Sequence, residues 1–475
     1  MRKRKYPQMS RVQRFGTEGF FAVPKAVATF LMLASCVSPT ASREYLVHNM
    51  PEYEKLAATL APGDIVTLAN GDWKNAELIF EAHGTAAKPV TLRAQTKGAV
   101  ILSGRSNLRL AGEYLVVSGL VFRNGYSADS DLISFRRKQG VVASNSRVTE
   151  IVIDNFSQPD PEEGENWIAL YGHDNRVDHS HIVGKASRGV TLAVIRDDPQ
   201  PMPDRHRIDH NYFGHRPPLG SNGGETIRVG TSDLSRSDSK TVIEENYFEE
   251  CDGEAEIISI KSGGNIIRRN VIVASQGSIV LRHGDGNVVE RNVILGKGKP
   301  ETGGIRIINA RHIVRDNYIE GVTGTDFYAA IAIMNGAKNP PLNGYSPVTD
   351  TLIERNSIID SAQVAIGAGA GDKRGVSPTR TTFTHNLVVG KDGVSPFTVG
   401  TETAGIAFID NRLSEAPADL AATMAAKPVT LARAANGLLY LADAADKSFG
   451  APRDLAPVAR SEVGVSWYKS AAAKN

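Results

Sequence analysis

A short phrase that recurs in the second half of the chain decides the fold: Glu245-Asn-Tyr-Phe248, Arg269-Asn-Val-Ile272, Arg291-Asn-Val-Ile294 and Asp316-Asn-Tyr-Ile319. Each copy has a polar residue and an asparagine before two apolar or aromatic residues. Related copies lie around Asn155, Asn211, Asn356 and Asn386. From Asn211 onward, successive asparagines are 35, 24, 22, 25, 39 and 30 residues apart. The short spacings define a period of 22–25 residues, and the longer ones fit that period with an inserted loop.

The segments between these phrases are short β-branched runs such as Ile257-Ile-Ser-Ile260. Strands this short cannot bury a face alone, but stacking one turn on the next forms a continuous core in which asparagines can align as a ladder. The repeat therefore predicts an all-β, single-domain, right-handed parallel β-helix. A β-sandwich or a propeller with repeating turns is the alternative, although propeller blades need a period of roughly 40–50 residues.

Both ends of such a solenoid need protection against pairing with other strands. Residues Pro51–Leu60 have an early proline and apolar residues at helical spacing, so they predict an N-terminal capping helix. A less regular segment from about residue 416, with the apolar stretch Leu420–Ala426, is expected to close the other end. No linker or break in composition marks a second domain, so residues 45–475 are assigned to the β-helix.

The composition agrees with a turn-rich β protein and excludes several other classes. The chain has 475 residues, of which 41% are hydrophobic and 22% charged, with 45 glycines and 23 prolines. Its two cysteines exclude a disulfide framework, and no Cys-x-x-Cys pair indicates zinc. No apolar run reaches about 18 residues, which argues against a membrane-spanning helix after processing.

Residues 1–35 have the pattern of an export signal. They carry seven basic residues and one acid, and a short apolar stretch, Ala26–Leu33, is followed by Ala34-Ser35-Cys36. Leu33–Cys36 resembles the bacterial lipobox, so Cys36 is predicted to be lipidated and to start the mature chain, with residues 36–44 as a linker. Plain cleavage nearby, for instance after Ala41, is the alternative. The expected location is the periplasm or the outer membrane of a Gram-negative bacterium, with membrane attachment only through Cys36.

Removal of the export signal would change the net charge of the protein. The full chain has 54 basic and 52 acidic residues, a net charge of +2, and loss of residues 1–35 leaves a net charge of −4. A protein of this charge does not attract polyanions as a whole. Nucleic acid is therefore not an expected partner, and any site for a polyanion must be a local cluster of cations.

The densest run of charged residues, from 222 to 306, contains such a cluster. Lys261 and Arg282 are 21 residues apart and Arg282 and Arg306 are 24 apart, each about one turn of the predicted solenoid. Residues one turn apart on stacked parallel strands lie about 4.8 Å from each other. The three cations are therefore expected to line one side of the solenoid, where they would suit an anionic polymer.

The acids of the same run point to a metal site. Glu254 and Glu256 are two residues apart, so both carboxylates face the same side of a strand, and Ca²⁺ accepts carboxylates together with an amide oxygen such as that of Asn222. A solvated acidic strand with surface ion pairs is the alternative. Strict alternation puts Lys261 on the opposite face, so it joins the glutamates only if a bend begins at Ser262-Gly-Gly264.

These residues resemble polysaccharide lyase family 6, the β-helical alginate lyases that also include chondroitinase B. The matching phrases are Asn222-Gly-Gly-Glu-Thr-Ile-Arg-Val-Gly-Thr-Ser232, Asp252-Gly-Glu-Ala-Glu-Ile-Ile-Ser-Ile-Lys-Ser262 and Leu281-Arg-His-Gly284. Upstream, Asn70–Trp73, Pro89–Ala94 and Leu115–Phe122 fit the same family. The likeness covers most of the mature chain.

The resemblance implies roles for individual residues. Lys261 matches the catalytic base of the family and Arg282 its partner. The calcium ligands of the family match Asn222, Glu254 and Glu256, with Glu225 as a fourth candidate, although some members do not need calcium. Substrate-binding positions of the family match His283 and Arg306, and Arg228 is a further candidate for substrate binding.

The implied reaction agrees with the chemistry of these side chains. β-Elimination from a uronate removes a weakly acidic C5 proton beside a carboxylate, whose charge Ca²⁺ and arginines can neutralise. A lysine accepts that proton only as a neutral amine, which neighbouring cations favour. The proton for the leaving O4 is expected to come from Arg282 or from a water beside it.

Two other functional classes fit the sequence less well. A pectinase-type glycoside hydrolase would use Glu254 and Glu256 as its acid pair, and the ultraviolet absorbance of unsaturated products separates it from a lyase. A noncatalytic carbohydrate-binding solenoid would leave the viscosity of the polymer unchanged. Alginate is the expected substrate because the Asn222–Ser232 phrase is closest to the alginate-degrading members, with dermatan sulfate as the alternative.

Overall fold

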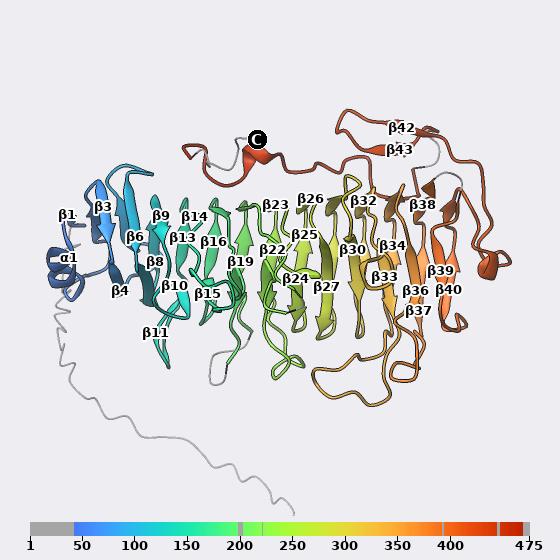
Figure 1. The fold of residues 1–475 in the computed structure, drawn as a ribbon, viewed down its shortest axis with the longest axis horizontal. Helices are drawn as coiled ribbons and strands as arrows, with labels where there is room; N and C mark the ends of the chain where they lie inside the picture. Colours follow the sequence, from blue (N-terminus) through green and yellow to red (C-terminus); the bar gives the residue numbers. More distant parts are fainter. Residues whose placement is uncertain (1–41, 198–202, 221, 392–393, 444–446, 469–475) are drawn as a thin grey trace, which may run out of the picture. The chain divides into compact units, whose positions relative to one another are not determined.

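The computed structural model describes residues 42–197, 203–220, 222–391, 394–443 and 447–468. Within these ranges, strands of successive turns pair in parallel and form three long sheets (Figure 1). From β13 onward each turn supplies one strand to each sheet in a fixed order. The predicted parallel β-helix is therefore confirmed.

Sheet 1 contains the first strand of each turn, counted in chain order from β13 onward. Its strands, in order, are β1 (Glu44–Val47), β2 (Ile65–Leu68), β5 (Val90–Ala94), β8 (Leu115–Ser118), β13 (Arg147–Thr149), β16 (Arg176–Asp178), β19 (Arg207–Asp209), β22 (Val242–Glu244), β25 (Ile266–Arg268), β28 (Val288–Glu290), β31 (Ile313–Arg315), β34 (Leu352–Glu354), β37 (Thr381–Thr384) and β40 (Ile406–Ile409).

Sheet 2 takes the next strand of each turn. Its strands are β3 (Gly71–Lys74), β6 (Val100–Gly104), β9 (Leu120–Gly125), β14 (Val152–Asp154), β17 (His181–Val183), β20 (Tyr212–Phe213), β23 (Tyr247–Glu249), β26 (Val271–Val273), β29 (Val293–Leu295), β32 (Tyr318–Glu320), β35 (Ser357–Ile359), β38 (Leu387–Val389) and β41 (Arg412–Leu413).

Sheet 3 completes each turn and carries the candidate site. Its strands are β11 (Arg136–Lys138), β12 (Val141–Ser144), β7 (Asn107–Glu113), β10 (Asp131–Ser134), β15 (Asn166–Leu170), β18 (Leu192–Val194), β21 (Ile227–Val229), β24 (Glu256–Lys261), β27 (Gly277–His283), β30 (Thr302–Ile307), β33 (Ile331–Met334), β36 (Val364–Ala368) and β39 (Phe397–Val399), with β4 (Glu77–His83) paired to β7. Short 3-10 helices are η1 (Asp326–Tyr328), η3 (Ala418–Leu420) and η4 (Arg460–Glu462).

The core consists of side chains that repeat at the same register position in every turn. On sheet 3, Ile227, Ile258, Ile279, Ile305 and Ile331 are successive register partners, and all are 0% exposed. Each isoleucine therefore packs on the one above and the one below, so that the core continues along the whole solenoid.

A ladder of asparagines fixes the turns from sheet 1 to sheet 2. It contains Asn211, Asn246, Asn270, Asn292, Asn317, Asn356, Asn386 and Asn411. The side-chain amide of each donates to Oδ1 of the next at 2.9–3.2 Å. The residue before each asparagine has a φ between 44° and 58°, which makes the corner of the turn. The asparagine of the recurring phrase is thus a structural residue.

The two ends are closed in different ways. Helix α1 (Met50–Ala57) begins after the N-cap Asn49 and buries Tyr53 at the N-terminal end, as the sequence predicts with slightly different bounds (Figure 1). At the other end, Leu420 and Met424 join the core.

Beyond Met424 the chain turns back along the outside of sheet 2, which the sequence did not predict (Figure 1). The hairpin of β42 (Leu431–Arg433) and β43 (Leu439–Leu441) packs Leu438 and Tyr440 against Val293 and Tyr318. Further along, Val463 packs on Tyr212, and Val465 reaches Val121 and Val152. The segment therefore covers the apolar outer surface of sheet 2 over many turns. None of the helices in the described ranges is long and apolar enough to span a bilayer.

We expect Asn292→Ala, in the middle of the ladder, to lower the free energy of unfolding by roughly 3 kcal/mol, because several buried hydrogen-bonding groups lose their partner. Asn292 Oδ1 accepts from the backbone and side chain of Asn270, and its amide donates to Ile267 O and Asn317 Oδ1. The control is Asn411→Ala, at the end of the ladder, which should cost about 1 kcal/mol because Asn411 is only half-buried and water can reach the groups it leaves. Equal losses for the two variants in urea unfolding would contradict the ladder as a main source of stability.

Candidate active site

Six of the residues singled out from the sequence come together on the outer face of sheet 3, where β21, β24, β27 and β30 stack: Glu225, Arg228, Glu256, Lys261, Arg282 and Arg306. Arg228 pairs in register with Ser259, Ser259 with Val280, and Val280 with Arg306. Side chains alternate between the core and the outer face along each strand. The outer face of these four strands therefore carries the candidate site.

A β-bulge in β24 brings Lys261 to the same face as Glu256. The register against β27 shifts between Glu256 and Ile258, and the extra residue, Ile257, turns into the core with 2% exposure. Alternation then restarts, so Ile258 and Ile260 point inward and Lys261 points outward. The expected bend at Ser262–Gly264 is therefore not what joins Lys261 to the glutamates, because the change of face occurs earlier.

Glu225 is the anionic partner of the lysine. Its Oε1 lies 3.4 Å from Lys261 Nζ and 3.7 Å from an Arg228 guanidinium nitrogen. The Glu225 side chain is 4% exposed, whereas Lys261 keeps 21% of its side chain accessible. The amine thus stands at the surface of the site above a buried carboxylate.

Glu256 plays the same part for the two other arginines. Its Oε1 lies 3.8 Å from Arg282 Nε and 3.7 Å from an Arg306 guanidinium nitrogen, and the Ser259 hydroxyl donates to its Oε2. Each of the two carboxylates therefore pairs with two cations that come from different turns. This arrangement holds four cations together without leaving them to repel one another.

The expected single column of Lys261, Arg282 and Arg306 is only approximately right. Lys261 is the register partner of His283, and Arg306 is the partner of Val280, two residues before Arg282. The cations are offset along the strands, and their side chains converge because both arginines reach the same carboxylate.

Two loops hold the arginines from the solvent side. The Arg282 guanidinium donates to Asn343 O at 3.0 Å and to Gly344 O at 3.2 Å, and it lies 4.4 Å from the centre of the Tyr345 ring. Arg306 Nε donates to Phe327 O at 2.8 Å, and burial lowers the pKa of this arginine. The sequence did not reveal these contacts, since the loop residues carry no charge and follow no repeat.

Three carboxylates of this site lie close together, and those of Glu225 and Glu254 are buried. Burial, together with the neighbouring carboxylates of Glu225 and Glu256, raises the pKa of Glu254 to about 8. Glu225 Oε2 and Glu254 Oε2 are buried and have no hydrogen-bond partner within the described part of the chain. These oxygens fit a hard cation such as Ca²⁺. Within the described ranges, however, no three acidic, His or Cys groups are placed to hold a metal.

The loops that carry these carboxylates pack backbone against backbone. A Cβ built on Gly224 would lie 2.3 Å from Gly253 O, and one built on Gly253 would lie 2.1 Å from Gly224 O. Only glycine fits at these two positions. The pair holds the Glu225 loop against the Glu254 loop, while Asn222 is exposed at the start of the first loop and its carbonyl accepts from Arg188 at 3.2 Å.

His283 lies at the edge of the site and is 3% exposed. Burial, and then the charges of Arg282 and Lys261, lower its pKa to about 3, so the imidazole is neutral near neutral pH. Its Nε2 lies 3.2 Å from the Ser232 hydroxyl. His283 can therefore give or accept a hydrogen bond beside the lysine, but it adds no charge.

Arg216 is a part of the site that sequence reasoning missed. It is 2% exposed, and its guanidinium donates to the carbonyls of Glu225 at 2.6 Å, Gly189 at 2.7 Å and Ser187 at 3.1 Å. Arg216 therefore fixes the backbone of Glu225 and places a buried positive charge near the carboxylates of Glu225 and Glu254. No pattern around Arg216 distinguishes it from a surface arginine, so only the fold reveals it.

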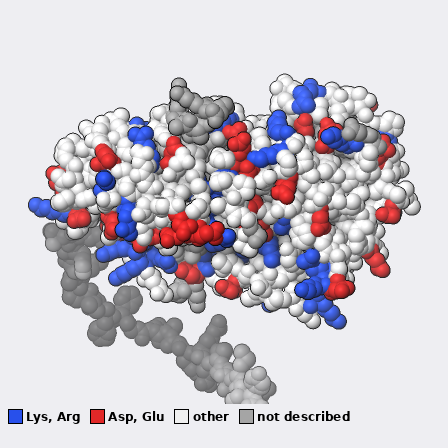
Figure 2. All heavy atoms as spheres, in the orientation of Figure 1, with Lys and Arg blue, Asp and Glu red and all other residues white. Residues whose placement is uncertain are grey.

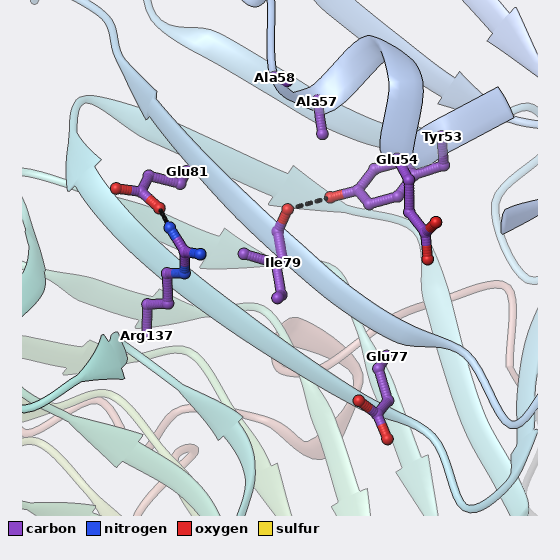
Figure 3. Close-up of a pocket in the computed structure, with 8 residues that line it drawn as sticks. All are labelled: Tyr53, Glu54, Ala57, Ala58, Glu77, Ile79, Glu81 and Arg137. Atoms are coloured by element: carbon purple, nitrogen blue, oxygen red, sulfur yellow. Dashed lines mark hydrogen bonds and ion pairs between the residues drawn. The ribbon is translucent and has the colours of Figure 1, made fainter. Parts of the chain in front are cut away.

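A pocket of about 500 Å³ between α1 and β4 is the main competing location (Figure 3). Tyr53 donates there to Ile79 O at 2.9 Å, and Arg137 pairs with Glu81. Its lining also contains Glu54 and Glu77, so acids outnumber the single cation and a polyanion would be repelled. On the face drawn in Figure 2, basic and acidic side chains are interspersed, and neither sign covers the whole face.

Comparison with known proteins places these residues in a family. The family model described as Chondroitinase B matches residues 47–447. The PL6 family alginate lyase AlyGC is similar, with 46% identity over 90% of this chain and a TM-score of 0.88, but the chain spans only 59% of its length. None of the curated proteins matches the sequence.

Two further solved structures are similar over nearly their whole length. A mannuronic acid specific polysaccharide family 6 lyase from human gut microbiota is 34% identical, with a TM-score of 0.75 and coverage of 82% of this chain and 91% of that one. The PL6 family polysaccharide lyase Pedsa3628 from Pseudopedobacter saltans is 26% identical, with a TM-score of 0.71 and coverage of 89% and 99%.

Proposed function

Because the chain belongs to the chondroitinase B family, polysaccharide lyase family 6, we propose that it cleaves alginate by β-elimination and leaves 4,5-unsaturated uronate ends. The observation that carries the proposal is an accessible lysine, Lys261, that shares one face with three arginines. These are Arg228, Arg282 and Arg306, and the carboxylates of Glu225 and Glu256 hold the four cations in place. A basic amine among guanidinium groups suits removal of a proton next to a sugar carboxylate.

Alginate is preferred as substrate on the strength of the relatives. AlyGC is described as an alginate lyase, and the relative from gut microbiota as specific for mannuronic acid. Dermatan sulfate is the second candidate, because the matching family model carries the name of chondroitinase B. Product absorbance on polymannuronate, polyguluronate and dermatan sulfate, measured side by side, distinguishes these substrates.

Lys261 and Arg282 act at different steps of the proposed elimination. Lys261 Nζ takes the C5 proton, the electrons of the C5–H bond form the C4–C5 double bond, and the C4–O4 bond breaks. The oxygen that leaves receives a proton from Arg282 or from a water that Arg282 holds. Lys261 acts only as a neutral amine, since an ammonium group has no lone pair to accept the proton.

The arginines stabilise the charge that develops on the uronate carboxylate. Arg306 has a buried guanidinium nitrogen and Arg228 a buried Nε for which the described residues provide no hydrogen-bond partner. Glu256 and Phe327 O already hold the other side of Arg306. Donors fixed in advance lose little freedom when the carboxylate arrives, which favours the transition state.

We also propose that Ca²⁺ binds Glu225, Glu254 and Glu256, with Asn222 as a further ligand. The support is the pair of unpartnered carboxylate oxygens and the raised pKa of Glu254, both of which a bound cation would relieve. When bound, the ion would supply positive charge to neutralise the substrate carboxylate.

Replacement of the lysine tests its role as the base. Lys261→Ala should lower kcat by at least about 10²-fold, the low end for loss of a general base, with an unchanged circular dichroism spectrum. Lys261→Arg should not restore activity, because guanidinium stays protonated. If Lys261→Arg keeps nearly full turnover, Lys261 is an electrostatic contact and the base lies elsewhere.

Calcium is tested by binding as well as by activity. Calorimetry should detect Ca²⁺ binding to the wild type, and Glu254→Gln should weaken it about tenfold or more, because affinity depends on the number of charged ligands. The exposed Glu250→Gln is the matched control and should bind like the wild type. A chelator should lower activity and added Ca²⁺ should restore it. Full activity in excess chelator, with no calorimetric signal, would contradict the metal role.

We further propose that the protein is exported and lipidated at Cys36. This residue lies outside the described residues, so the support is the sequence of Leu33–Cys36 and the basic segment before it. Mass spectrometry of the mature protein should find a lipidated cysteine at its N-terminus, and Cys36→Ser should release the protein from membranes. An unmodified N-terminus beyond residue 36 would contradict the anchor.

A further inference from the structure

A second pocket, of about 240 Å³, opens beside the candidate active site. Its lining includes Arg236, Asp238, His283, Asp285, Arg311 and Leu342. Roughly eight water molecules would fill it, at about 30 Å³ each. This is room enough for one sugar unit.

The pocket continues directly from the ends of β24 and β27. His283 belongs to both sites, because it lines the pocket and is the register partner of Lys261. Gly263 lies two residues after Lys261, and Gly284 follows His283, so backbone without side chains forms this part of the lining. A polymer whose reacting unit lies over Lys261 would therefore place a neighbouring unit at the pocket.

Two arginines and two aspartates line the pocket. One arginine and one aspartate form an ion pair with each other, and the other two have no ion-pair partner in the described residues. Arg311 pairs with Asp285 at 2.8 Å, and Asp285 also accepts from the Ala310 backbone at 3.0 Å. Arg236 is exposed and makes no ion pair within the described residues, and the Asp238 carboxylate also has no ion-pair partner there. One free guanidinium and one free carboxylate therefore face an incoming ligand.

This combination fits a uronate unit better than a simple anion. A uronate carries one carboxylate, which a guanidinium binds, and several hydroxyl groups, which can donate to a carboxylate such as that of Asp238. Inorganic sulfate has no such donors near neutral pH and would be repelled by Asp238. Pro341 and Leu342 add an apolar wall, and Leu342 is 40% exposed, so the apolar face of a pyranose ring has a surface to contact.

The wall of the pocket also holds Arg282. Pro341, Leu342 and Ser346 flank Asn343 and Gly344, whose carbonyls accept from the Arg282 guanidinium. A sugar packed against this loop would therefore favour the loop position that orients Arg282. Binding energy from a unit that does not react can in this way assist the reacting unit.

We propose that this pocket is a subsite for the uronate unit next to the one that loses its C5 proton, with Arg236 binding its carboxylate and Asp238 its hydroxyl groups. The inference rests on the proposed function and deepens it, since it explains how the enzyme would recognise more than one unit of the chain.

Oligomannuronates of increasing length test the subsite. For the wild type, kcat/KM should rise by about tenfold or more on adding the unit that reaches the pocket, as expected for a charge-assisted contact. In Arg236→Ala that increase should disappear, while the shortest substrate is cleaved at the wild-type rate. Lys240→Ala, which removes an exposed cation of the same loop that does not line the pocket, is the matched control and should keep the increase.

The results that would contradict the subsite differ from those that would contradict the proposed lyase function. If Arg236→Ala keeps the increase, or loses activity equally at every length, Arg236 does not bind the neighbouring unit and the subsite is wrong. A wild type whose kcat/KM does not change with length contradicts it as well. If the wild type cleaves no oligouronate of any length, the proposed function fails and the subsite fails with it.

Discussion

Parallel register between successive turns is the constraint on which the rest of the structure depends. It places residues of adjacent turns about 4.8 Å apart, so whatever one turn presents must be compatible with the next. Inside, this favours columns of identical residues such as Ile258 and Ile279. On the outer face the same spacing would bring like charges together. Glu225 and Glu256 each pair with cations of two neighbouring turns and so make the cationic site compatible with stacking.

The repeat could be predicted from sequence because it is periodic and chemically simple. The asparagines mark the turns, and each bonds to the next, so their spacing carries the register directly. The capping helix was predictable for a similar reason, since a proline and helical spacing are local signals. The residues of the candidate site could be chosen from the sequence around Lys261 and Arg282, because this combination resembles one family.

Features that break the period could not be predicted. The bulge at Ile257 moves Lys261 to the face of the glutamates, but in sequence Ile257 is one more isoleucine in an apolar run. Arg216 depends on carbonyls from distant loops, and Tyr345 reaches Arg282 from a long insertion. The return of the C-terminal segment along sheet 2 rests on dispersed apolar contacts without a repeat. These features arise from tertiary packing, and each of them except the C-terminal segment adjoins the site.

The central claim is that this constellation performs elimination and not hydrolysis. The masses of the products from a purified oligomannuronate test it most directly, because elimination adds nothing to the substrate whereas hydrolysis adds one water. The account predicts two products whose masses sum to that of the substrate, one with the ultraviolet absorbance of a C4–C5 double bond. Products that together exceed the substrate by one water, without that absorbance, would contradict it.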